Sequence, residues 1–275
     1  MANWDKLTGR GNVDDRRGMT ATKIGGASIA GVLLLMGVNY LMGGNPLDAL
    51  DQIDIESIIN QVVTPTDTAT TEFDGTDSYE EFASTVLGST NDYWGRTFQE
   101  QGHTYDEPTL VLFRDATDSA CGGASSNVGP HYCPGDNTIY LDETFFDELS
   151  SQLGARGGDV AEAYVVAHEV GHHVQNLFDN IAASDNSNEA SIKTELQADC
   201  FAGLWAHSIR DQNVFTPGEI AEAMDAAAAV GDDRIQQKIE GAVNPETWTH
   251  GSAADRVAAF SKGYETGDYA NCDSN

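Results

Sequence analysis

The stretch VVAHEVGHHVQNL, residues 165–177, carries three histidines and one glutamate within six positions. On an α-helix, residues four apart are separated by about 40° in azimuth and about 6 Å along the axis. The imidazoles of His168 and His172 can therefore converge on one tetrahedral Zn²⁺. His173 is five residues from His168, about 140° around the helix, so we expect it to face away or to pack at the edge.

Glu169 directly follows the first of these two histidines. From that position its carboxylate can reach the fourth zinc position, where a water molecule sits. We expect Glu169 to act as general base on this zinc-bound water and to carry the proton to the leaving amine. The five-residue pattern alone arises by chance in about one percent of comparable chains, so histidines without a metal are the alternative.

A third ligand is available in the stretch TELQADCFAGLWAH, residues 194–207. Glu195 and Asp199 form a Glu-x-x-Ala-Asp arrangement on a second predicted helix, a pattern typical of gluzincins. Glu195 would bind the zinc, and Asp199 could accept a hydrogen bond from the far nitrogen of a ligand histidine. The alternative for both acids is a solvated helix face.

The developing oxyanion of a tetrahedral transition state needs a hydrogen-bond donor. His250 precedes a predicted helix in TWTHGSAADR and is our candidate for this catalytic role. The strand NTIYLD, residues 137–142, is a candidate sheet edge for pairing with an extended peptide. Other donors are available in Arg256, Tyr132, Tyr140 and Tyr164.

The chain has 275 residues and a net charge of −30, which excludes nucleic acid as a partner because phosphates would be repelled. Residues 24–42 contain no charged side chain, and five basic residues precede them. Such a stretch is long enough to cross a bilayer as a helix. The positive-inside rule then predicts a single-pass cell-membrane protein with a cytoplasmic N-terminus and an extracytoplasmic catalytic domain. A cleaved signal peptide and a buried core helix are the alternatives.

The remaining pattern predicts an α+β protein, with a mostly helical zincin-type domain and a small β-sheet. We expect a cytoplasmic tail over 1–22, a transmembrane helix over 23–43, an acidic linker over 44–78 and the metallopeptidase domain over 79–275. Ser78 and Glu81 suggest a capping box at the start of that domain. Helices are expected over 78–102, 143–154, 159–178, 189–212, 216 onward and 252–264, with strands over 108–113 and 137–142.

Several segments together resemble the bacterial membrane-anchored "putative neutral zinc metallopeptidase" family. They include GNVDDRR, CGGASSNVGPHYCPGDNTIYLDETFF, AHEVGHHVQNL, ELQADCFAGLWAH and THGSAADRVAAF. The resemblance implies a zincin-type catalytic domain that binds Zn²⁺ through His168, His172 and Glu195, with Glu169 as the catalytic residue. This chain departs from the pattern at His131, where an aromatic residue is expected, and we interpret this as a surface change.

Four cysteines suit two disulfides in an oxidising compartment, and three pairings are possible. We favour Cys121–Cys133, which would close a Gly/Ser-rich loop, and Cys200–Cys272. Cys200 lies five residues after Glu195 and so points away from the metal, free to tie the C-terminal tail to the ligand helix. Four free thiols are the alternative.

The residues favour a membrane-anchored zinc endopeptidase that hydrolyses peptide bonds of a peptide or protein substrate outside the cytoplasm. One alternative is a non-catalytic, zinc-stabilised envelope scaffold or binding module, which would hold the metal with four protein ligands. Another is a hydrolase of non-peptide amides, which would use the same residues.

Overall fold

The computed structural model of the chain describes residues 1–18, 77–125, 129–178, 187–216, 218–239 and 241–272. The expected transmembrane helix over 23–43 and the expected linker over 44–78, apart from its last two residues, lie outside these residues. The helices are α3 (Ser78–Glu100), α4 (Phe145–Ser151), α5 (Asp159–Leu177), α6 (Asn188–Ile209), α7 (Ile220–Ala229), α8 (Asp232–Ile239) and α9 (Ala253–Thr266). The strands are β1 (Asn12–Asp15), β2 (Thr109–Phe113), β3 (Ala116–Ser119), β4 (Gly122–Ser125), β5 (His131–Cys133) and β6 (Thr138–Asp142).

These elements confirm the predicted α+β class, in which helices predominate and the sheet is small. The expected helix over 159–178 and the strands over 108–113 and 137–142 are found almost unchanged as α5, β2 and β6. The sequence analysis missed β1, the β3–β4 hairpin, β5 and α8. Among the described helices, none combines the length and the apolar character needed to cross a bilayer.

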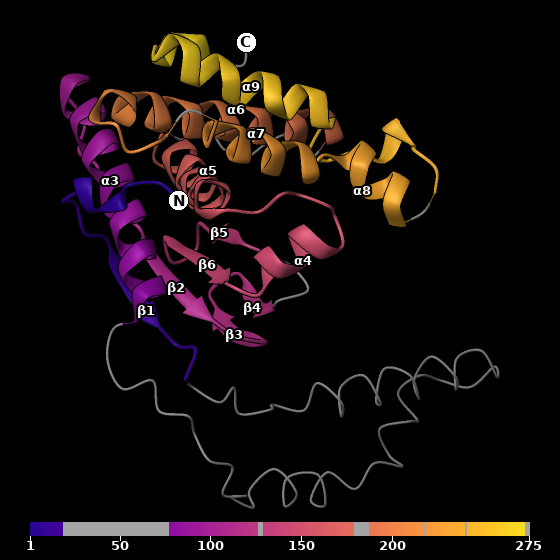
Figure 1. The fold of residues 1–275 in the computed structure, drawn as a ribbon, viewed down its shortest axis with the longest axis horizontal. Helices are drawn as coiled ribbons and strands as arrows, with labels where there is room; N and C mark the ends of the chain where they lie inside the picture. Colours follow the sequence, from indigo (N-terminus) through magenta and orange to yellow (C-terminus); the bar gives the residue numbers. More distant parts are fainter. Residues whose placement is uncertain (19–76, 126–128, 179–186, 217, 240, 273–275) are drawn as a thin grey trace, which may run out of the picture. The chain divides into compact units, whose positions relative to one another are not determined.

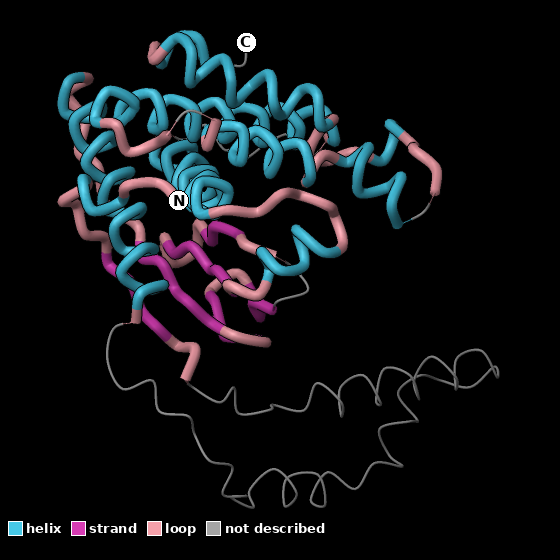
Figure 2. The backbone as a smooth tube through the Cα atoms, in the orientation of Figure 1, coloured by secondary structure: helices cyan, strands magenta, loops and turns pink. Residues whose placement is uncertain are grey.

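Helix α5 occupies the middle layer of the fold. Figure 1 shows it between the sheet on one side and α6, α7 and α9 on the other. Figure 2 shows the same separation of strands and helices by colour. Fourteen of the 19 residues of α5 are buried, which explains why its apolar residues surround the helix instead of forming one stripe. The helix that carries the HEVGH motif is therefore held from both sides.

The main sheet has the strand order β1-β2-β6-β5. The first three strands are parallel, and β5 runs antiparallel to β6. The expectation that NTIYLD forms a sheet edge is wrong, because β6 lies between β2 and β5. Its five residues are all buried, as a central strand requires. Among the described strands, the edge next to α5 is β5.

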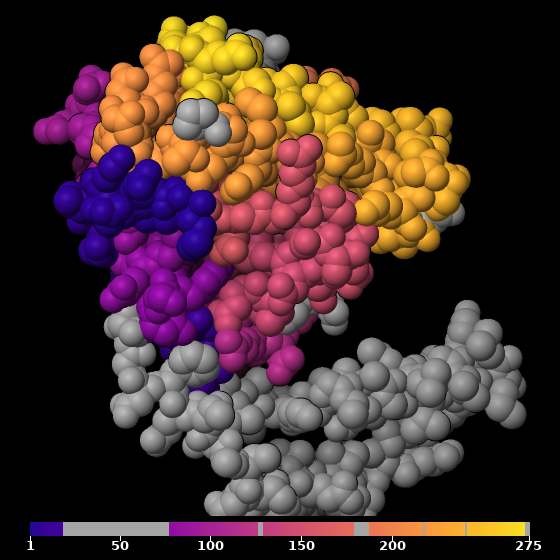
Figure 3. All heavy atoms as spheres, in the orientation of Figure 1, coloured from indigo at the N-terminus to yellow at the C-terminus, as the bar shows by residue number. Residues whose placement is uncertain are grey.

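The first 17 residues belong to the same compact unit as the rest of the described chain. Strand β1 pairs with β2, and the Asn3 amide donates to the Val214 carbonyl at 2.7 Å. The Trp4 indole lies edge-on to Phe82, with ring centroids 5.3 Å apart. Figure 3 shows these N-terminal residues, in indigo, against the surfaces of α3 and of the chain near residue 214. The expected separate tail over 1–22 is thus wrong as far as residue 17.

Arg17 fixes the end of this N-terminal segment. Its side chain is 1% exposed and contacts three carboxylates, at 2.7 Å from Asp15, 3.0 Å from Asp77 and 2.8 Å from Glu143. Asp77 is also the N-cap of α3, where its side chain accepts from two backbone amides. The capping residue is therefore Asp77 and not Ser78, which the sequence analysis expected. One buried guanidinium joins β1, the start of α3 and the loop after β6.

Both expected disulfides are present. Cys121 is bonded to Cys133, which links the turn between β3 and β4 to the edge strand β5. Cys200 is bonded to Cys272, which ties the C-terminal segment to α6. All four cysteines of the chain are consumed in this way, so none can serve as a metal ligand.

Candidate metal centre

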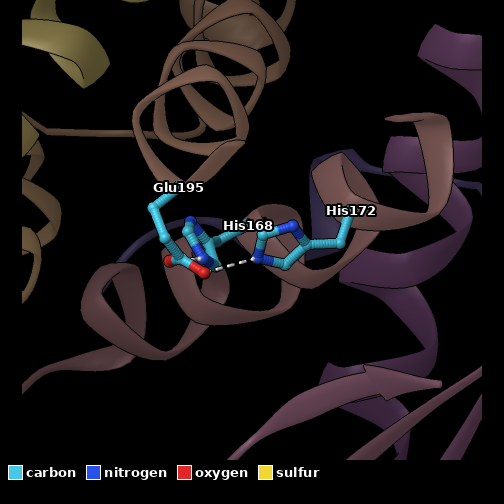
Figure 4. A group of neighbouring side chains, drawn as sticks. All are labelled: His168, His172 and Glu195. Atoms are coloured by element: carbon cyan, nitrogen blue, oxygen red, sulfur yellow. Dashed lines mark ion pairs between the residues drawn. The ribbon is translucent and has the colours of Figure 1, made fainter. Parts of the chain in front are cut away.

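The structure brings together the three residues that the sequence analysis names as zinc ligands. His168 and His172 lie one turn apart on α5, and Glu195 reaches them from α6. One ligand atom of each residue lies within 4.8 Å of the other two. The Glu195 carboxylate is 3.2 Å from His168 Nε2 through one oxygen and 3.4 Å from His172 Nε2 through the other. Figure 4 shows this carboxylate facing both rings.

Gly171 allows α6 to come this close to α5. A Cβ atom at position 171 would lie 3.0 Å from both the Cα and the carbonyl oxygen of Ala198, closer than ordinary van der Waals contact. The glycine lies between the two ligand histidines, and Ala198 is three residues after Glu195. A larger residue at either position would push the third ligand away from the other two.

The donor set fits Zn²⁺. Imidazole nitrogen and carboxylate oxygen bind zinc at about 2.0–2.2 Å, and tetrahedral geometry then separates neighbouring ligand atoms by roughly 3.4 Å. In the metal-free structure each histidine Nε2 contacts a different oxygen of Glu195, at 3.2 and 3.4 Å, and one ligand atom of each residue lies within 4.8 Å of the others, close to this spacing. Within the described part of the chain, no second group of three such residues is found. Three protein ligands leave one position open, which is typical of catalytic zinc sites.

His168 is positioned by a buried network of charges. Its Nδ1 donates to Asp199 Oδ1 at 2.9 Å, which leaves Nε2 facing Glu195. Arg256, from α9, contacts both oxygens of Asp199 at 2.8 and 2.9 Å. Tyr164 also donates to Asp199. Asp199 thus lies where the sequence analysis places it, and its charge is balanced by an arginine 57 residues away.

His172 is positioned differently, by a neutral side chain. Its Nδ1 lies 2.9 Å from Oε1 of Gln175, one turn further along α5. Neither ring therefore has a free Nδ1, and both offer Nε2 to the metal position. The sequence analysis missed Gln175, although its place three residues after His172 on the same helix was a usable signal.

Glu169 is buried, with 6% of its surface exposed. Its Oε2 has no hydrogen-bond partner among the described residues. A buried carboxylate oxygen without a donor is costly unless a further molecule or ion supplies one. Glu169 directly follows His168 on α5, and this oxygen can still accept a hydrogen bond from a further molecule.

His173, which we expected to face away from the ligand pair or to pack at the edge, is fully buried. Its Nε2 donates to the Asp106 carbonyl at 2.6 Å, so its Nδ1 accepts from the Tyr132 hydroxyl at 3.0 Å. Burial lowers the pKa of His173, in keeping with a neutral ring. This histidine attaches the edge strand β5 to the ligand helix.

The structure does not join His250 to this site. The His250 ring lies 3.3 Å from Asp232 and 3.0 Å from Thr249, and half of its side chain is exposed. Tyr140 donates to Asp136. Of the donors proposed from the sequence, Arg256 contacts two ligands, with one nitrogen 3.4 Å from His168 Nδ1 and 3.6 Å from the Glu195 carboxylate.

The charges of the site are strongly coupled. Burial on its own would lower the pKa of His168, but Asp199 and Glu195 outweigh it and raise this pKa to about 10. Burial likewise opposes the charge on Glu195, yet the two histidines hold its pKa well below the ordinary value. Burial would raise the pKa of Asp199, but the charges of Arg256 and His168 outweigh burial and lower this pKa. In the metal-free protein the ligands are therefore held by their own opposite charges.

One family model and several known proteins match this chain. The family model described as "Putative neutral zinc metallopeptidase" matches residues 2–275. The chain is 44% identical over 207 residues to "Uncharacterized protein YpfJ" of Escherichia coli (strain K12), covering 72% of each chain. It is 48% identical over 184 residues to "Uncharacterized protein Rv2575" of Mycobacterium tuberculosis (strain H37Rv), covering 62% of this chain and 63% of the relative. No solved structure matches the chain.

The family match spans nearly the whole sequence and includes both helices that supply the candidate ligands. Membership implies zinc as the cofactor, which agrees with the donor set at the crossing of α5 and α6. The chain therefore belongs to the family described as "putative neutral zinc metallopeptidase".

Proposed function

We propose that the chain is a zinc-dependent endopeptidase in which His168, His172 and Glu195 hold the metal. The observation that carries this proposal is the convergence of three ligand atoms within 4.8 Å, with a buried glutamate, Glu169, directly after the ligand His168. A structural zinc site would use four protein ligands. The three ligands of the described chain therefore favour catalysis over the non-catalytic scaffold.

A zinc ion in this site would lower the pKa of a water molecule and polarise the carbonyl group of a substrate. Glu169 would accept a proton from that water, because its Oε2 has no partner among the described residues and Glu169 directly follows the ligand His168. As the peptide bond breaks, the same carboxylate would pass the proton to the leaving nitrogen. Asp199 and Gln175 would hold the two imidazoles in the tautomer that this arrangement needs.

The edge strand β5 supports an extended peptide as substrate. It pairs with β6 on one side, and no described strand covers the other. Strand β5 packs against α5, and the contact of Tyr132 with His173 fixes this packing. A peptide that adds to β5 would thus run beside the ligand helix. Parallel assays on peptides and on cell-wall fragments separate peptidase activity from hydrolysis of non-peptide amides.

We further propose that the catalytic domain works outside the cytoplasm, because its two disulfides suit an oxidising compartment. Strand β1 cannot pair with β2 across a bilayer. The expected orientation, with the N-terminus and the domain on opposite sides of one span, is therefore incompatible with this sheet. In our proposal residues 1–17 lie in the same compartment as the domain.

The variant Glu169→Gln should retain one zinc ion and lose cleavage of peptides by about 10²–10⁴-fold, since it removes the general base and no ligand. Zinc content by mass spectrometry and kcat on a peptide library measure the two effects. Glu189→Gln is the matched control, because Glu189 is an exposed glutamate on α6. Undiminished cleavage by Glu169→Gln would contradict the proposed mechanism.

Zinc affinity should rise with pH. The pKa of His168 is about 10 in the metal-free protein against an ordinary value of 6.5, so zinc displaces a proton at neutral pH. The raised pKa stabilises the metal-free fold below pH 6.5, and this contribution is lost as the pH rises toward about 10. Titrations in two buffers of different ionisation enthalpy count the released protons, and thermal melts with and without chelator follow the stability. An affinity that does not change from pH 6.5 upward would refute this coupling.

Cysteines at positions 12 and 109 should form a disulfide in intact cells. The two residues are directly opposite in β1 and β2, and Asn12 Nδ2 lies 3.0 Å from Thr109 Oγ1. Labelling with a maleimide before and after reduction reports the bond, and the variants Asn12→Cys and Thr109→Cys alone serve as controls. Two free thiols in the double variant would show that the N-terminal segment and the domain do not share an oxidising compartment.

A further inference from the structure

We propose that Gln175 is a positioning residue that joins the ligand His172 to the helix of Glu195 and to the Cys200–Cys272 disulfide. The proposal rests on the proposed zinc site. In it, Gln175 supports the ligand His172, and this support depends on the C-terminal segment. The proposal follows from the orientation of two buried amide side chains.

The orientation of the Gln175 amide is fixed by its partners. Its nitrogen lies 2.8 Å from the Thr194 carbonyl and 2.9 Å from Gln197 Oε1, and a carbonyl oxygen can only accept. The nitrogen must therefore face α6, and Oε1 must face His172 at 2.9 Å. Because Oε1 accepts, His172 carries its proton on Nδ1. The lone pair of Nε2 is then directed to the metal position.

Gln175 also connects the two ligand helices. Both hydrogens of its amide bind acceptors on α6, and one acceptor belongs to Thr194, the residue just before the ligand Glu195. The Gln175 side chain is buried, with 1% of its surface exposed, so water does not readily replace these bonds. One side chain therefore sets the tautomer of His172 and the distance of α6 from α5 at the third ligand.

The network continues from α6 to the C-terminal segment. Gln197 accepts from Gln175 and donates through Nε2 to the Cys272 carbonyl at 3.3 Å. Cys272 is held by its disulfide to Cys200, which lies on α6 one turn after Gln197. The Gln175 network is thus a chain of hydrogen bonds from the His172 ring through Gln175 and Gln197 to this disulfide. Every side chain between the ring and the disulfide is uncharged.

The two histidines therefore have independent supports. Asp199 and Arg256 position His168, and none of the hydrogen bonds among the described residues joins them to Gln175 or Gln197. A change in the Gln175 network should act on His172 and leave the Asp199 contact of His168 intact. This selectivity separates a positioning role from a general loss of packing.

The variant Gln175→Met removes both functions of the amide at similar volume. We expect its affinity for zinc alone, measured by competition with a chromogenic chelator, to fall about 10–100-fold. In the zinc-loaded protein, the His172 Nδ1–H signal in a ¹H–¹⁵N imidazole spectrum should disappear through exchange with solvent, while the His168 signal persists. Gln99→Met, at an exposed glutamine of α3, is the matched control and should change neither.

Two further variants locate the parts of the network. Gln197→Met keeps the bond from Gln175 to His172, so it should retain the His172 signal and lose less affinity than Gln175→Met. Replacing Cys200 and Cys272 together by serine should lower zinc affinity in the same direction, by less than Gln175→Met. If Gln175→Met does not fold, the zinc affinities of these two variants still test the network.

Zinc affinity of Gln175→Met within twofold of the wild type would overturn the inference. Equal loss of the His168 and His172 signals would do so as well, because it indicates a general structural defect. Unchanged affinity in both Gln197→Met and the cysteine double variant would remove the link to the disulfide. Wild-type protein that fails to bind zinc or to cleave peptides contradicts the proposed function instead, so the two failures are distinguishable.

Discussion

The site depends on the close crossing of α5 and α6. Gly171 lies against the backbone at Ala198, and a Cβ atom at position 171 would come within 3.0 Å of that backbone, so a larger side chain would press the helices apart. This approach places Glu195 within 3.2–3.4 Å of both ligand nitrogens of α5. The sheet on one side of α5 and the helices α7 and α9 on the other hold the crossing in place. The layered fold thus serves to keep two helices at one fixed separation.

Burial of charge is the main energetic difficulty of this arrangement. Asp199 is fully buried, and a buried carboxylate without its partner would cost about 3–5 kcal/mol. Arg256 offsets this cost with two contacts, which makes α9 part of the site although it supplies no ligand. Arg17 has the same function just after β1, where it balances three carboxylates. Each buried arginine joins elements that are distant in the sequence, so the charges stabilise the fold and the site together.

The sequence predicted the parts of the site that depend on local spacing. His168, Glu169 and His172 follow from one helical repeat, and the second motif indicated Glu195 and Asp199. Arg256 as the partner of Asp199 could not be predicted, because their contact requires α9 to pack on α6. Strand β1 was missed since NVDD has the composition of a polar loop and pairs with a strand 97 residues away. His250 was named for its position before a helix, and only the structure shows that it lies against Asp232.

The most direct test of the central claim is X-ray absorption spectroscopy of the protein loaded with one equivalent of zinc. We predict stoichiometric binding, with two imidazole nitrogens and carboxylate oxygen at about 2.0–2.2 Å and no sulfur in the coordination shell. The spectrum of the variant Glu195→Gln should show a changed oxygen contribution and the same two imidazoles. A shell that contains sulfur, a third imidazole, or no bound zinc at all would contradict the metal centre at the crossing of α5 and α6.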